Sequence, residues 1–92
     1  SVSIISKIKI NFINIKILSD INLYKSNVLF DICCFEDLIR IFYNSNIIIQ
    51  NCLYNIYNMD YENIQLIEVN NHSSCKFKGF KLFKINLKLL KN

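Results

Sequence analysis

The sequence has 92 residues, of which 52% are hydrophobic and 20% charged, and its formal net charge is +4. This length predicts a single domain over residues 1–92 with a small core, and the apolar excess predicts that partners cover part of its surface. No stretch has the roughly 18 uncharged apolar residues that a membrane helix needs, so we expect no membrane span.

The residue usage is strongly biased. Ile, Asn, Lys, Phe and Tyr make up more than half of the chain, and Ala, Thr, Pro and Trp are absent. The favoured residues have codons built from A and U alone. This indicates an AU-rich genome, such as that of an organelle, and it weakens the use of Asn as a turn signal.

The charges are unevenly distributed along the chain. Residues 1–18 carry three lysines and no acid, and residues 76–92 carry six lysines and no acid. The segment between them has a net charge of −5. Basic ends around an acidic middle predict one face that is suited to phosphate groups.

The first part of the chain predicts a strand followed by a helix. Residues 2–18 alternate between apolar and polar, and the phase flips at Phe12–Ile13, which predicts one long strand with a bulge. Ser19–Asp20 then resembles a helix start, and a helix is predicted over Ile21–Phe42. Its apolar stripe recurs at three- and four-residue steps: Ile21, Tyr24, Val28, Ile32, Phe35, Ile39 and Phe42.

The second half predicts strands. Ile47–Tyr57 and Asn63–Asn70 are rich in β-forming residues, and the polar residues 58–62 between them predict a hairpin. A polar loop over residues 70–74 precedes the last strand. The sequence shows no evident internal repeat. The order β–α–β–β–β predicts an α+β two-layer sandwich, with one helix packed on a mixed or antiparallel sheet.

The last stretch, Cys75–Asn92, carries the main functional signal. It alternates lysines with apolar residues, slips in phase across Gly79, and contains no acid and no proline. We expect a bulged strand with one apolar face and one cationic face that binds RNA phosphates. An alternative is that the lysines only protect an exposed sheet edge from aggregation. The predicted RNA-binding residues are Lys7, Lys9, His72, Lys76, Lys78, Lys81, Lys84, Lys88 and Lys91. Phe80 and Tyr61 are candidates for stacking on bases.

The sequence offers little for catalysis or metal binding. Its four cysteines, Cys33, Cys34, Cys52 and Cys75, contain no C-x-x-C pair, so buried free thiols in a reducing compartment are expected. A zinc site with His72 stays an alternative, since His72 and Cys75 have acceptable ligand spacing. The adjacent Glu36 and Asp37 predict a solvated surface. We therefore predict no enzyme activity, no catalytic or metal residues, no cofactor and no small-molecule substrate.

The chain resembles the small-subunit ribosomal proteins of the S-ten family. The similarity lies in a predicted strand–helix–strand opening, in Ile64–Val69 followed by Asn71-His72, and in the basic Phe80-Lys81-Leu82. The sequence departs from the family in having no proline before His72 and no counterpart of the closing helix and strand. The resemblance implies contact with ribosomal RNA through His72 and the lysines beyond it.

The sequence therefore predicts a structural, rRNA-contacting protein of an organellar, mitochondrial-type ribosome, with ribosomal RNA and neighbouring ribosomal proteins as partners. The alternative is a non-catalytic subunit or protein-interaction module of another large assembly, such as a respiratory complex. The apolar excess favours either kind of assembly.

Overall fold

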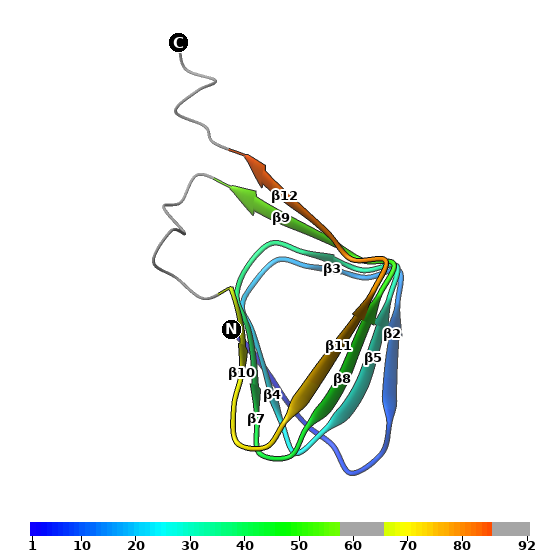
Figure 1. Cartoon of the computed structure of the whole chain (residues 1–92), viewed down its shortest axis with the longest axis vertical. Helices are drawn as coiled ribbons and strands as arrows, with labels where there is room; N and C mark the ends of the chain where they lie inside the picture. Colours follow the sequence, from blue (N-terminus) through cyan, green and yellow to red (C-terminus); the bar gives the residue numbers. More distant parts are fainter. Residues whose placement is uncertain (58–65, 86–92) are drawn as a thin grey trace.

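The chain forms a three-sided solenoid of parallel β-strands (Figure 1). The computed structural model describes the backbone of residues 1–57 and 66–85, and the side chains of these residues except 56–57 and 82–85. Within this part of the chain the strands are β1 (Val2–Ile5), β2 (Ile10–Ile13), β3 (Lys16–Ile17), β4 (Ile21–Tyr24), β5 (Asn27–Asp31), β6 (Cys34–Phe35), β7 (Ile39–Phe42), β8 (Asn46–Gln50), β9 (Leu53–Tyr57), β10 (Ile67–Val69), β11 (Ser74–Lys78) and β12 (Lys81–Ile85).

Each turn of the chain, here called a coil, contributes one strand to each of three sheets. Coil 1 covers residues 1–20, coil 2 residues 21–38, coil 3 residues 39–57 and 66, and coil 4 residues 67–85. The strand orders are β1-β4-β7-β10 in sheet A, β11-β8-β5-β2 in sheet B and β12-β9-β6-β3 in sheet C. All pairings are parallel, so each strand residue lies above its equivalent in the next coil. Ile21 pairs with Ile39, 18 positions later, whereas Ile39 pairs with Ile67, 28 positions later.

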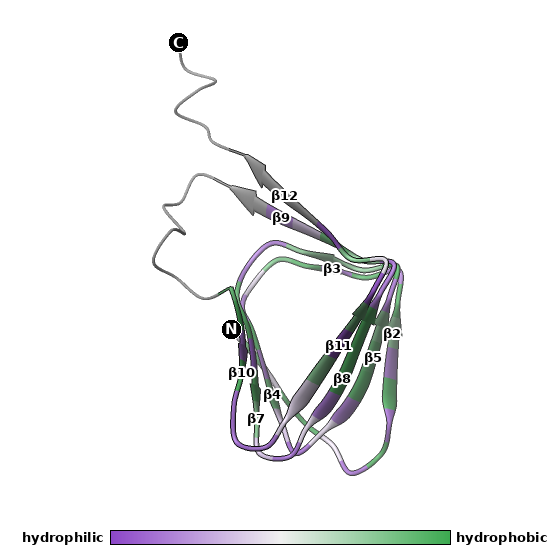
Figure 2. Ribbon diagram, in the orientation of Figure 1, coloured by the Kyte–Doolittle hydropathy of each residue, from purple (hydrophilic) through white to green (hydrophobic). Residues whose placement is uncertain are grey.

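The core is the inside of this triangle, where inward side chains form ladders along the stack. Alternation along each strand points every second side chain inward, as the burial pattern of β5 and β8 shows. Both strands begin with a hydrophilic residue and are hydrophobic through their middle (Figure 2). The buried apolar residues are Ile21, Leu23, Val28, Phe30, Cys33, Phe35, Ile39, Ile41, Ile47, Ile49, Cys52 and Tyr54. All belong to coils 2 and 3, because these two coils are covered on both sides.

The corners use residues in the left-handed conformation. Asn14, Ile32, Asn51 and Gly79 occupy equivalent positions between sheets B and C, with φ between 51° and 62°. Asn and Gly tolerate this conformation well. A Cβ on Gly79 would lie 2.8 Å from Asn51 Oδ1, so a side chain at this corner would have to displace the Asn51 amide. Several Asn residues are therefore structural, contrary to the expectation that composition made them uninformative.

The predicted α+β sandwich and its helix over Ile21–Phe42 are wrong. The described residues contain no helix, and this segment forms β4 to β7. The stripe arose because the buried Ile21, Val28 and Phe35 of successive strands lie seven positions apart, which is close to two turns of a helix. Four members of the stripe are buried: Ile21, Val28, Phe35 and Ile39. However, Ile32 is 56% exposed, whereas a helix that faced the core with this stripe would bury it.

The phase slips in the sequence are corners rather than bulges. The flip after Phe12 leads into the corner at Asn14, and the slip at Gly79 separates β11 from β12. The predicted strand regions 47–57 and 63–70 do contain strands, β8 to β10. The hairpin expected at 58–62 falls outside the described residues. However, β9 and β10 belong to different sheets, so they are not a hairpin pair.

Candidate interaction surfaces

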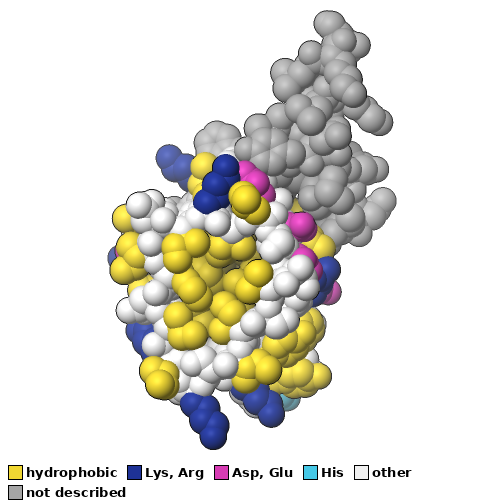
Figure 3. Space-filling model, turned by 180° about the vertical axis from the view of Figure 1, so that it is seen from behind, with side chains coloured by type: hydrophobic (Ala, Val, Ile, Leu, Met, Phe, Trp, Pro, Cys, Tyr) yellow, Lys and Arg dark blue, Asp and Glu magenta, His cyan; other side chains and the backbone are white. Residues whose placement is uncertain are grey.

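Coil 1 forms one end of the stack and leaves the solenoid interior open. A hollow of about 260 Å³ lies there, lined by Val2, Ile4, Phe12, Ile15, Lys16, Ile17, Leu18, Ser19 and Ile21. Figure 3 looks onto this end and shows a continuous hydrophobic patch inside a rim of other atoms. We call this surface the N-terminal end face.

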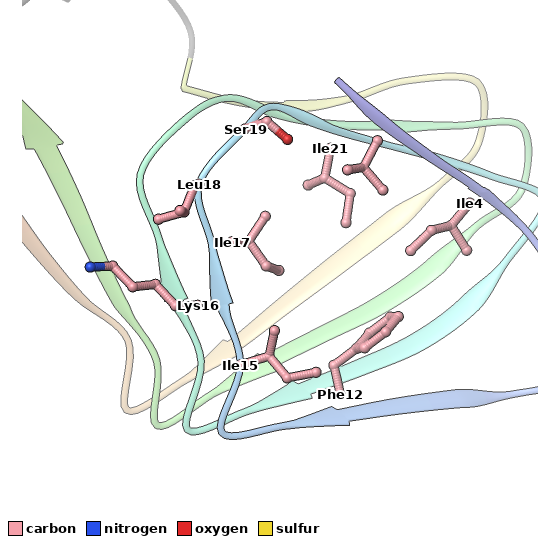
Figure 4. A pocket seen from close by; sticks show the side chains of 9 residues that line it. Ile4, Phe12, Ile15, Lys16, Ile17, Leu18, Ser19 and Ile21 are labelled. Atoms are coloured by element: carbon pink, nitrogen blue, oxygen red, sulfur yellow. The ribbon is translucent and has the colours of Figure 1, made fainter.

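The inward apolar side chains of the N-terminal end face occupy core positions that no further described strand covers. In Figure 4, Ile4, Phe12, Ile15 and Ile17 point into the hollow, whereas Lys16 points away from it. Register explains this orientation, because Ile4 pairs with the buried Leu23 and Phe12 with the buried Phe30. The alternation that fills the core in coil 2 thus places apolar side chains inward in coil 1 as well.

Coil 4 forms the opposite end of the stack. Phe77 occupies the ladder of Phe30 and Ile49, yet it is 49% exposed because no further described strand covers it. Its ring packs against Phe80 at a centroid distance of 5.1 Å, and Phe80 contacts Tyr54 edge-on. We call this surface the C-terminal end face and define it by the described inward residues of coil 4: Ile67, Val69, Cys75, Phe77 and Phe80.

The lysines of β11 lie on one outer face, as the alternation predicted. Lys76 and Lys78 are exposed and pair with Ile48 and Gln50 of β8. Lys81 is also exposed but follows the corner, so it begins a different sheet. Lys84 belongs to β12 but its side chain is outside the described set, and Lys88 and Lys91 lie outside the described residues.

The other predicted RNA-binding residues are not joined into one row with these lysines. Lys7 and Lys9 are exposed in coil 1, where β2 is the edge of sheet B farthest from β11. His72 is exposed at the corner between β10 and β11, where φ is 60°. The first and last described strands, β1 and β12, lie in different sheets and are not neighbours. The described cationic row is limited to the coil 4 lysines.

Ion pairs tie the outer ladder of sheet A together. Arg40 Nη1 lies 2.8 Å from Asp20 Oδ2, and Arg40 Nε lies 3.4 Å from Glu68 Oε2. The hydrogen bond from Arg40 holds the pKa of Asp20 below its usual value of 3.8. The acidic middle of the sequence is thus partly neutralised by Arg40, and Glu36 is 3.3 Å from Lys16.

The cysteines are free thiols with structural positions. The Cys33 N–H donates to Cys52 Sγ at 3.3 Å, which links coils 2 and 3 inside the core. Burial raises the pKa of both Cys52 and Cys75 to about 11, so these thiols resist forming thiolates. Among residues 1–57 and 66–85, no three His, Cys, Asp or Glu side chains lie close enough together to hold a metal ion.

Sequence reasoning missed a ladder of corner serines. The Ser6 N–H donates to Ser26 Oγ, Ser26 N–H to Ser45 Oγ, and Ser45 N–H to Ser73 Oγ, each at 3.0 Å. The signal is present in the sequence as Ser26-Asn27, Ser45-Asn46 and Ser73-Ser74. Repeats of this kind, spaced by one coil, are typical of solenoids.

The fold therefore places the protein in the class of three-sided parallel β-solenoids. In the described residues no helix is long and apolar enough to cross a membrane. No family model, curated protein or solved structure matches this chain.

Proposed function

We propose that this chain is a non-catalytic protein-interaction module of a larger assembly, and that it binds through its N-terminal end face. The single observation that carries this proposal is the uncovered interior of coil 1. Val2 is 44% exposed, although its ladder neighbour Ile21 in coil 2 is only 2% exposed. Core-type residues that remain in contact with water mark a surface that a partner can cover favourably, because burying apolar side chains lowers the free energy.

The backbone supports the same conclusion. Coil 1 presents the free edges of β1, β2 and β3, and a parallel strand edge offers unpaired N–H and C=O groups to another chain. An end of this kind thus combines an apolar centre with hydrogen-bonding groups around it. A partner that extends the solenoid by strand addition would satisfy both.

The test uses the chain in extracts of its source cells. We expect the wild-type chain to migrate with an assembly larger than itself in size-exclusion chromatography. Ile15→Lys, which places a charge at the hollow, should release the chain, because burying an unpaired ammonium group is unfavourable.

Ile5→Lys is the matched control, because it adds the same charge to the same coil outside the hollow. Ile5 is 74% exposed and follows the inward Ile4 in β1, so its side chain points outward. This variant should stay with the assembly. Equal behaviour of the two variants would contradict the proposal.

Contact with ribosomal RNA is the second candidate function. It is favoured by the shared outward face of Lys76 and Lys78, with Lys81 near them in the chain. Against it stands the separation of Lys7 and Lys9 from these lysines across sheet B. The S-ten resemblance loses its implied helix over Ile21–Phe42, because β4 to β7 replace it.

Filter binding to RNA over a salt series tests this second function. If the lysines bind phosphates, affinity should fall as the salt concentration rises. Lys76→Gln/Lys78→Gln should then lower the slope of log K against log salt by about 0.7 for each phosphate of single-stranded RNA that is no longer neutralised. Lys25→Gln, on an exposed corner of coil 2, is the control. An affinity that does not change with salt concentration would contradict phosphate binding.

A further inference from the structure

We propose that the partner of the N-terminal end face is the C-terminal end face of a second copy of this chain, so that copies stack head to tail into a longer solenoid. This inference rests on the proposed function and names its partner. It follows from the way in which the four coils already pack on one another.

The two end faces correspond to the two surfaces that meet wherever one coil packs on the next. In each sheet, the strand at one end belongs to coil 1 and the strand at the other end to coil 4. Placing coil 4 of one copy on coil 1 of the next therefore continues all three sheets with the same parallel direction. The contact needs no new type of interaction, because coils 1 and 2 already pair in this way.

The inward ladders match chemically across this junction. Phe12 stacks on Phe30 within the chain, with a centroid distance of 5.4 Å, and Phe77 lies at the same ladder position in coil 4. Stacking would place Phe77 of one copy over Phe12 of the next. Val69 and Ile4 share a second inward ladder with Leu23, so apolar side chains meet apolar side chains there as well.

The serine ladder supplies polar continuity. In coils 1 to 3, the serine N–H donates to the serine hydroxyl of the following coil. At the end of the stack the Ser73 N–H instead donates to Asn70 O at 3.2 Å, within its own corner. At the start of the stack, Ser6 Oγ bonds to the N–H and the carbonyl of Ile8 in its own corner. Ser73 of one copy and Ser6 of the next would extend the same pattern.

Charged side chains on the outside of the solenoid affect the strength of this association. Lys16 and Lys81 occupy one outer ladder through Cys34 and Leu53, so stacking brings two positive charges together. Lys16 is already 3.3 Å from Glu36, which offsets part of its charge. We therefore expect an association that strengthens when salt screens this repulsion.

A head-to-tail contact of this kind does not close on itself. Its two surfaces are different, so each added copy exposes the same pair of ends and the product is an open series of oligomers. Sedimentation velocity of the purified 92-residue chain should show a weight-average mass that rises with concentration above the 10.9 kDa of one copy.

Variants that each block one end give the decisive test. Ile15→Lys blocks the N-terminal end face and Phe77→Lys the C-terminal end face. Each alone should remain at the mass of one copy, whereas Ile5→Lys should assemble as the wild type does. Circular dichroism and a cooperative thermal transition establish that each variant is folded, and Val2→Lys is a second N-terminal variant because Val2 lines the hollow and is 44% exposed.

Mixing the two blocked variants distinguishes this arrangement from other forms of association. The mixture has one intact N-terminal and one intact C-terminal end face, so it should form 1:1 dimers and nothing larger. A wild-type chain that stays at the mass of one copy at all concentrations, or a mixture that stays monomeric, would overturn head-to-tail stacking.

The outcome in cell extracts separates the two proposals. If the purified chain does not self-associate but Ile15→Lys still releases it from its assembly, the partner is another protein and only the second-copy inference fails. If Ile15→Lys has no effect in either experiment, the interaction role of the N-terminal end face fails as well.

Discussion

Ile32 is the residue whose backbone conformation suits its side chain least. Its φ of 57° is left-handed, and it is β-branched and 56% exposed, so burial does not offset the strain. The equivalent residues in the other coils are Asn14, Asn51 and Gly79. Residues that tolerate this conformation therefore occupy three of these four corners.

Replacing Ile32 by Asn should stabilise the protein by about 1 kcal/mol, because Asn adopts the left-handed conformation at a lower cost. The measurement is the free energy of unfolding in urea. Ile48→Asn is the control, since Ile48 is also exposed but lies in β8, where Asn is a poor strand former. A loss of stability in Ile32→Asn would contradict the assigned corner.

Ser45 holds the centre of the serine ladder and is fully buried. Its Oγ accepts the Ser26 N–H at 3.0 Å and donates to Phe42 O at 2.7 Å. Ser45→Ala leaves both of these groups without the hydroxyl and should lower the free energy of unfolding by about 1–3 kcal/mol. Ser74→Ala removes only an exposed bond to Asn46 and should change it by less than about 0.5 kcal/mol. Equal effects of the two substitutions on urea unfolding would contradict a structural role for the ladder.

For the strands and corners, the sequence shows correctly which side chains alternate between the two faces of a strand. It misleads about the period at which apolar residues recur. The outward positions of Lys76 and Lys78 are predicted correctly, because a two-residue period leaves a direct mark in the sequence. The prediction of a helix over residues 21–42 is wrong, because short strands separated by corners place buried residues seven positions apart, as Ile21, Val28 and Phe35 are, and this spacing imitates two helical turns. The Ser-Asn pairs at 26–27 and 45–46 are the evidence against it.

Arg40 is the residue that joins the outer ladder of sheet A across the stack. Arg40→Gln should lower the thermal midpoint at pH 7, because it leaves Asp20 and Glu68 without their cation. The pKa of Asp20 is lowered in the folded protein, so this contribution is present above pH 3.8 and is lost as pH falls through the folded value.

The difference between Arg40→Gln and the wild type should accordingly shrink below pH 3.8. Thermal melts over a pH series measure it, with Lys25→Gln as a variant of the same charge change at an exposed corner. A difference that does not depend on pH would mean that Arg40 acts through packing rather than through charge.

The whole molecule is a short stack whose stability depends on contacts between neighbouring coils. Coils 2 and 3 hold the buried core, and coils 1 and 4 expose core-type residues at the two ends. This division is beyond sequence reasoning, because equivalent positions of coils 2 and 3 are 18 or 19 residues apart and those of coils 3 and 4 are 28 apart, which hides the repeat. The apolar excess does predict that apolar side chains remain exposed, but not where they lie.

The most direct test of this fold is a set of backbone nuclear Overhauser effects on the isotope-labelled chain. The solenoid predicts contacts between Val28 and Ile47 and between Ile47 and Cys75, which are neighbours in sheet B although they lie 19 and 28 positions apart. Contacts between residues three apart, continuous over residues 21–42 and without these long-range ones, would contradict it.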